Sequence, residues 1–136
     1  MISVVGRAIL LIMAINEGFK IVVGIEFAEE LYRDSLLLVS NSLSNKKFKR
    51  CKIILDDATN YMINEKFNVF FFYNPFNEIV LIKVLQNLEK SLHNYNRKVY
   101  IIYFNPIHSK IILKYGYNIS YKYESKEKVE ILIFYK

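Results

Sequence analysis

The sequence predicts a single α/β domain whose mostly parallel sheet ends in an antiparallel hairpin. Two apolar runs, Lys20–Ile25 and Val69–Tyr73, are rich in β-branched or aromatic residues, as strands are. Each run precedes a segment in which apolar residues recur every three or four positions, the spacing of an amphipathic helix. Strands that alternate with helices form parallel sheets. The chain then ends in two strand-like segments with no helix between them, Tyr117–Tyr123 and Val129–Tyr135, which predicts the hairpin.

The run Val69–Tyr73 is the centre of this prediction. It carries no charge and suits a strand buried on both faces, as the central strands of parallel sheets are. The helix expected after it has one apolar face, made by Leu81, Val84, Leu85, Leu88 and Leu92. Ligands of open α/β sheets bind just beyond the carboxyl ends of such strands, and here Asn74, Pro75 and Phe76 occupy that place.

The other elements follow in chain order. Arg7–Glu17 is apolar on most sides and predicts a largely buried helix, with Gly18 in the capping position after it. We further expect a helix over Ala28–Asn41, a basic loop at Asn45–Arg50, a strand over Lys52–Leu55, a turn or a single helical turn at Tyr61–Lys66, a strand over Lys98–Phe104 and a short helix over Ile107–Tyr115. Only Met1–Val5 precedes the first helix, and five residues leave little room for a strand and its turn.

Length and composition describe a globular chain. Its 136 residues suit one domain, and no linker or low-complexity segment divides them. The single cysteine, Cys51, forms no internal disulfide, which fits a reducing, cytoplasmic setting. The apolar stretch Ala8–Ile15 is far too short to span a membrane, and no small-residue cleavage site follows it, so we expect neither a membrane segment nor a signal peptide.

The formal net charge is +6, and five of the seven residues from Lys46 to Lys52 are Lys or Arg. Such a cluster can bind nucleic acid or another polyanion. The alternative is a solvated loop with no partner.

Two acidic residues lie where predicted strands end. Glu26 follows the strand at Lys20–Ile25, and an ionised carboxylate at this place can accept hydrogen bonds from ribose hydroxyls. The alternative is a helix N-terminal charge favoured by the helix dipole. Asp57-Ala58 follows the next strand and could receive an adenine amino group, or Asp57 could form a helix cap or an Asx turn.

Asn74-Pro75-Phe76 also has two interpretations. Asn is a good N-cap and Pro suits a first helical turn, which the second Asn-Pro pair, Asn105-Pro106, supports. Alternatively, the Asn74 amide grips a polar substrate group while Phe76 stacks on it.

Few other residues suggest chemistry. His93 and His108 have no Cys or carboxylate at the spacing of metal ligands, so we predict no metal site. There is no Ser–His–Asp set, and no phosphate-binding Gly-rich loop surrounds Gly6.

Together these strand ends resemble class I S-adenosylmethionine-dependent methyltransferases, most closely a group of small bacterial and archaeal members. Gly6-Arg7 is similar to the tail of the family's Gly-rich loop, and Val23-Gly24-Ile25-Glu26 to its second strand and ribose-binding acid. Asp57-Ala58 resembles the adenine-side motif, and Tyr73-Asn74-Pro75-Phe76 the fourth motif. The resemblance implies a Rossmann-like methyltransferase sheet, S-adenosylmethionine as cofactor at Gly6, Glu26, Asp57 and Ala58, and an unknown methyl acceptor at Asn74, Pro75 and Phe76.

One departure from the family is large. Met1–Val5 stands where its first strand and first glycines should be, and the β-branched Val4 and Val5 would obstruct the approach of a cofactor. We therefore expect the first strand to be missing and the domain over residues 1–136 to be truncated or degenerate at its N-terminus, which leaves activity open. The alternative is a non-catalytic Rossmann-like domain that binds RNA or another polyanion through Lys46, Lys47, Lys49, Arg50 and Lys52.

Overall fold

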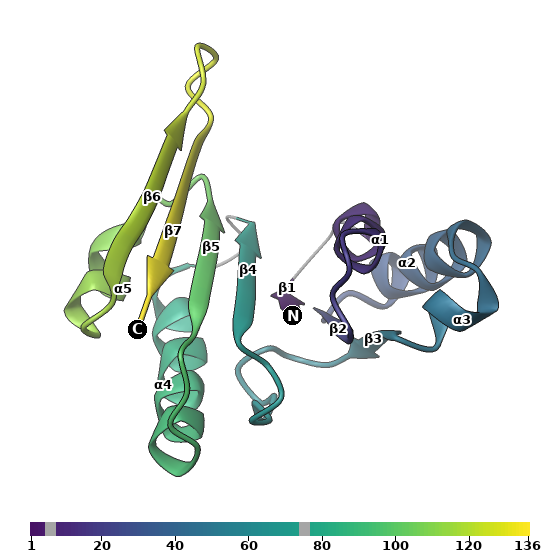
Figure 1. The fold of residues 1–136 in the computed structure, drawn as a ribbon, viewed down its shortest axis with the longest axis horizontal. Helices are drawn as coiled ribbons and strands as arrows, with labels where there is room; N and C mark the ends of the chain where they lie inside the picture. The colour runs from purple at the N-terminus through teal and green to yellow at the C-terminus, as the bar shows by residue number, and fades with distance from the viewer. Residues whose placement is uncertain (5–7, 74–76) are drawn as a thin grey trace. The chain divides into compact units, whose positions relative to one another are not determined.

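A computed structural model describes residues 1–4, 8–73 and 77–136 of the chain. The chain divides into two compact units, Met1–Asn60 and Tyr61–Lys136 (Figure 1), and each unit contains both helices and strands. The prediction of one domain over residues 1–136 stays a prediction. None of the helices in the described ranges is long and apolar enough to cross a membrane.

The first unit is a parallel three-stranded arrangement with β2 in the middle. Its elements are β1 (Ile2–Val4), α1 (Ala8–Asn16), β2 (Val22–Glu26), α2 (Glu29–Ser42), α3 (Asn45–Phe48) and β3 (Cys51–Leu55). Ile2 pairs with Val23 on one side of β2, and Glu26 pairs with Leu55 on the other. All five residues of β2 are buried. Helices α1 and α2 contact each other and both pack against β2 and β3, so they cover one face of the strands.

The expected absence of the first strand is wrong. Ile2–Val4 forms β1, which pairs in parallel with β2. The pairing is extended by the amide of Val23, which donates to the carbonyl of Met1 at 3.0 Å. Each of its three residues lies opposite a buried residue of β2, namely Val23, Gly24 and Ile25. The strand at the centre of the unit therefore has a partner on each side.

Gly24 lets α1 approach β2 closely. A Cβ added at this position would lie 2.7 Å from the Cδ1 atom of Leu11, a buried residue of α1. The glycine of Val23-Gly24-Ile25-Glu26 thus has a packing role inside the unit, because its missing side chain leaves room for Leu11.

The second unit carries the antiparallel hairpin that the sequence predicts. Its elements are β4 (Val69–Tyr73), α4 (Glu78–Asn94), β5 (Tyr100–Phe104), α5 (Ser109–Lys114), β6 (Asn118–Glu124) and β7 (Glu130–Tyr135). Strands β4 and β5 are parallel, β7 is antiparallel to β5, and β6 pairs with β7 alone. Parallel strands followed by an antiparallel pair confirm the α/β fold class.

The core of the second unit lies between its strands and α4. Burial alternates along β4 and β5, so that Phe70, Phe72, Ile101 and Tyr103 are buried and their neighbours are half-buried. Four of the five predicted apolar residues of α4 are buried, namely Leu81, Val84, Leu85 and Leu88. Figure 1 shows α4 behind β5 in this view. The prediction that β4 is buried on both faces is wrong, because only one of its faces is fully covered.

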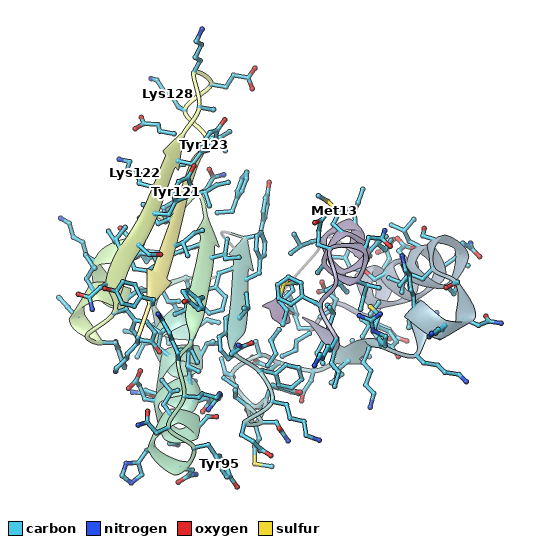
Figure 2. The ribbon with its side chains drawn as sticks, viewed as in Figure 1. Met13, Tyr95, Tyr121, Lys122, Tyr123 and Lys128 are labelled. Carbon is cyan, nitrogen blue, oxygen red and sulfur yellow. The ribbon has the colours of Figure 1, made fainter. Side chains whose placement is uncertain are left out.

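Strand β6 is the outer strand of the hairpin, and all of its residues are exposed. Tyr121 and Tyr123 project from it beside Lys122 (Figure 2), which forms ion pairs with Glu124 and Glu130 at 3.6 and 3.2 Å. The ladder shifts register between Ile119 and Tyr121. A charged lysine and an irregularity are two devices that keep an outer strand from pairing with other chains.

One smaller expectation needs correction. The basic loop at Asn45–Arg50 begins with a helical turn, α3, whose preceding residue Ser44 is extended. The turn expected at Tyr61–Lys66 is confirmed, since Glu65 and Lys66 form a turn and no helix lies among the described residues between β3 and β4. Gly18 follows the end of α1 with a positive φ of 98°, as expected, and Gly116 follows α5 in the same way with φ of 83°.

We predict that Gly24→Ala lowers the free energy of unfolding by roughly 1–3 kcal/mol, because the new methyl group overlaps Leu11. Leu11→Ala removes that overlap. The loss of unfolding free energy in the double variant should therefore be smaller than the sum of the two single losses. Chemical denaturation of the three variants measures this coupling. Strictly additive losses, or no loss in Gly24→Ala, would contradict the packing role.

Candidate functional site

The carboxyl ends of β1, β2 and β3 lie at one edge of the first unit because the three strands are parallel. We call this the carboxyl edge and the opposite one the amino edge. Strand β2 ends at Glu26, and β3 ends at Leu55 directly before Asp56 and Asp57. The amide of Asp56 donates to the carbonyl of Glu26 at 3.0 Å. The structure thus brings together Glu26 and the Asp57-Ala58 pair.

Glu26 is a buried carboxylate, with only 3% of its surface exposed. Its Oε1 atom accepts a hydrogen bond from the amide of Ala28 at 3.0 Å. Ala28 is the N-cap residue of α2 and has no capping side chain, so Glu26 serves the start of the helix. This agrees with the helix interpretation of Glu26, but α2 also has exposed Glu29 and Glu30 in its first turn. A carboxylate offers about four acceptor positions, so holding the helix start is compatible with binding a ligand.

Asp57 forms the Asx turn that was one interpretation of it. Its Oδ1 atom accepts from the amide of Thr59 at 2.8 Å, and its carbonyl accepts from Asn60 at 2.9 Å. Asp56 Oδ1 in turn accepts from the amide of Asp57 at 2.7 Å. Ala58 is half-buried within this turn. The binding of adenine by Asp57-Ala58 stays a prediction.

The carboxyl edge is strongly acidic. Six of the seven acidic residues of the first unit lie at the strand ends or in the first turns of α2: Glu26, Glu29, Glu30, Asp34, Asp56 and Asp57. We call them the acidic cluster. Arg33, a basic residue within α2, forms an ion pair with Glu29. The edge therefore presents hydrogen-bond acceptors and negative charge.

Two apolar side chains beside these acids are unusually exposed. Phe27 follows Glu26 and is 74% exposed, while Leu55 pairs with Glu26 and is 45% exposed. The sequence reasoning missed both as candidate site residues. An aromatic residue directly after an acid at a strand end is the signal that could have found Phe27, because planar ligands pack on such side chains.

Four of the predicted site residues, Gly6 and Asn74 to Phe76, lie outside the described residues. The start of the helix that follows them is described. Helix α4 is capped by Asn77, whose Oδ1 atom accepts from the amide of Val80 at 3.0 Å. Asn77, three residues after Asn74 in the sequence, is therefore the N-cap residue of this helix. Asn105 does not cap α5, because it lies in a left-handed turn with φ of 48° and His108 holds the N-cap position.

The remaining reactive residue types are not assembled into a site. His93 lies in the last turn of α4, and His108 precedes α5. In the part of the chain that the structure describes, no group of three His, Cys, Asp or Glu side chains could hold a metal ion. Cys51 begins β3 and is buried, and this burial raises the pKa of its thiol to about 11.

No protein-family model matches the sequence, and no curated protein matches it either. Similarity to solved structures is clear. A glycopeptide N-methyltransferase matches with a TM-score of 0.77 at 8% identity, over 99% of this chain and 82% of its own. A candidate tRNA (m1A22) methyltransferase from Streptococcus pneumoniae, solved in complex with S-adenosyl-L-methionine, matches with a TM-score of 0.70 at 18% identity, over 98% of this chain.

An uncharacterised protein from Listeria monocytogenes matches with a TM-score of 0.71 at 14% identity, again over 98% of this chain. The chain spans 60% of the length of the Listeria protein and 64% of that from Streptococcus pneumoniae. At these identities the comparisons show the fold alone. The chain has a Rossmann-like fold that it shares with methyltransferases.

We predict that Asn77→Ala lowers the free energy of unfolding by about 1 kcal/mol, because it removes the cap of α4. Asn74→Ala should cost clearly less in the same denaturant titration. The reverse order of the two losses would restore Asn74 as the cap.

The Cys51 thiol should react with a disulfide reagent at least about tenfold more slowly in the folded protein at pH 8 than in the denatured chain, because burial keeps it protonated. Its pKa rises from 9.0 to about 11 on folding, so its contribution to stability is lost as the pH rises through that range. Equal reaction rates in the two states would show that Cys51 is accessible.

Proposed function

We propose that this chain is an S-adenosylmethionine-binding methyltransferase domain whose cofactor lies at the carboxyl edge. One observation carries the proposal: Glu26 is a buried carboxylate, held in place by Ala28 at the end of β2, in a fold shared with methyltransferases. The methyl acceptor is not specified by this argument.

The side chains at the carboxyl edge fit this cofactor chemically. S-adenosylmethionine offers two ribose hydroxyls and an adenine amino group as donors, and a carboxylate such as Glu26 only accepts. Phe27, next to Glu26 in the chain, and Leu55, opposite Glu26 on β3, offer exposed apolar surface to a planar base. The donors of the cofactor therefore match the carboxylate acceptor, and its planar adenine ring matches the exposed apolar side chains.

Charge supports this cofactor over phosphate-bearing ones. The acidic cluster places six carboxylates at the carboxyl edge of the first unit. Pyrophosphate groups of dinucleotides or of nucleoside triphosphates would be repelled there, since like charges in a partly desolvated site are costly. A cofactor with a sulfonium cation and no phosphate meets no such penalty.

The residues of this chain would act by binding and orienting. When bound, S-adenosylmethionine supplies an activated methyl group. Glu26 would accept from the ribose hydroxyls, and Asp57 with Ala58 would receive the adenine edge. Asn74, Pro75 and Phe76 would hold the acceptor, as the resemblance implies. Holding the two reactants in line lowers a large part of the activation barrier in such transfers, so no acid or base need be assigned.

The experiment is a calorimetric titration of the chain with S-adenosylhomocysteine. We expect saturable binding that Glu26→Gln weakens at least about tenfold, because a hydrogen bond to a charged acceptor is lost. Gln keeps an acceptor oxygen for the amide of Ala28, so this variant should remain folded.

The matched control is Glu17→Gln, the same change at the amino edge, which should leave the affinity within about twofold. A folded chain that gives neither heat nor a shift in melting temperature with this ligand would refute the proposal. Equal weakening in both variants would remove the assignment of Glu26.

A further inference from the structure

The amino edge of the first unit carries the opposite charge to the carboxyl edge. Six basic residues lie before or at the start of β2 and β3: Lys20, Lys46, Lys47, Lys49, Arg50 and Lys52. Glu17, just after α1, is the acidic residue at this edge. Within the described ranges, no ion pair joins any of these cations to a carboxylate.

Two of the six cations hold segments of the amino edge together through hydrogen bonds. Lys47 donates to Asn16 Oδ1 at 2.7 Å, which ties α3 to the end of α1. Arg50 donates from Nε to the carbonyl of Lys20 at 2.9 Å and from Nη2 to the carbonyl of Phe19. Both bond to neutral acceptors, so neither positive charge is cancelled.

The other four cations, Lys20, Lys46, Lys49 and Lys52, are exposed. We call them the basic surface. They come from three consecutive pieces of structure, the approach to β2, the helical turn α3 and the start of β3. Because Arg50 binds the carbonyl of Lys20 itself, these pieces are held together and the four ammonium groups share one edge.

The chemistry of this edge selects a polyanion with many phosphates. An exposed lysine binds phosphate oxygens as a point charge. Several lysines on one surface can release counterions from a nucleic acid backbone. A membrane surface is a poorer match, since α3 has only four residues and exposes the single apolar side chain Phe48. Interfacial helices need a broad apolar face to enter lipid.

The basic surface is remote from the acidic cluster. At the rise of a strand, Lys20 is about 20 Å from Glu26, six residues away, and Lys52 is about 13 Å from Asp56, four residues away. Both distances exceed the Debye length of about 8 Å at physiological ionic strength, so the acids weaken the attraction of the lysines for phosphate only partly. A small anion would gain nothing here beyond one or two contacts, whereas a long one could bridge all four lysines.

We infer that the amino edge of the first unit is a nucleic-acid-binding surface, on which Lys20, Lys46, Lys49 and Lys52 contact backbone phosphates without reading base sequence. The inference does not depend on the proposed cofactor. Where both hold, the nucleic acid is anchored at one edge while chemistry occurs at the other.

The test is fluorescence anisotropy of a fluorescein-labelled RNA hairpin with the full chain and no cofactor. Four phosphate contacts predict a slope of log affinity against log salt near −3, or about a sixty-fold loss between about 50 and about 200 mM salt. The variant Lys20→Gln/Lys46→Gln/Lys49→Gln/Lys52→Gln should bind at least about tenfold more weakly at the lower salt.

The matched control removes four exposed lysines from the helices of the second unit, as Lys83→Gln/Lys90→Gln/Lys110→Gln/Lys114→Gln. It loses the same net charge and should stay within about threefold of the unaltered chain if binding is local. Equal losses in both variants would overturn the inference, as would a salt-independent affinity. Binding to phosphatidylserine vesicles but not to the RNA would also overturn it and assign the surface to lipid. Melting temperatures confirm that each variant is folded.

Discussion

The parallel register of β2 between β1 and β3 decides where each charged group of the first unit lies. Because Ile2 is opposite Val23 and Glu26 is opposite Leu55, all three strands end at the same edge. A helix that follows such a strand must start at that edge and return to the other, which places the acids of α2 beside Glu26 and the lysines of α3 at the far edge. An antiparallel β3 would have mixed the two charges. The separation of acidic and basic edges is thus a consequence of strand direction.

This separation would allow one small unit to bind the two proposed ligands at different places. A cofactor without phosphates would meet carboxylate acceptors and exposed Phe27 at the carboxyl edge, where phosphates would be repelled. A nucleic acid would meet lysines at the amino edge, where Arg50 and Lys47 donate to neutral acceptors and keep their charge. The two ligands would not compete for residues.

The parts of the fold that follow from local pattern were predictable from sequence. The period of Leu81, Val84, Leu85 and Leu88 predicts the buried face of α4, and glycines mark the ends of α1 and α5. The acids at strand ends, Glu26 and Asp57, were found because their places depend only on where strands stop. Long-range features were not predictable: the short strand β1 is stabilised by pairing with β2, which is distant in the sequence, and the cap of α4 is Asn77. The exposure of Phe27 is likewise a tertiary property, although its place directly after an acid at a strand end can be read from the sequence.

The most direct test of this account is an amide NMR titration of the chain with two ligands in turn. S-adenosylhomocysteine should shift the amide signals of Phe27, Ala28 and Asp57 and leave those of Lys46, Lys49 and Lys52 in place. The RNA hairpin should do the reverse, and each ligand should shift its own set equally when the other is bound. Shifts of the same amides by both ligands, or cofactor shifts confined to the amino edge, would contradict the account.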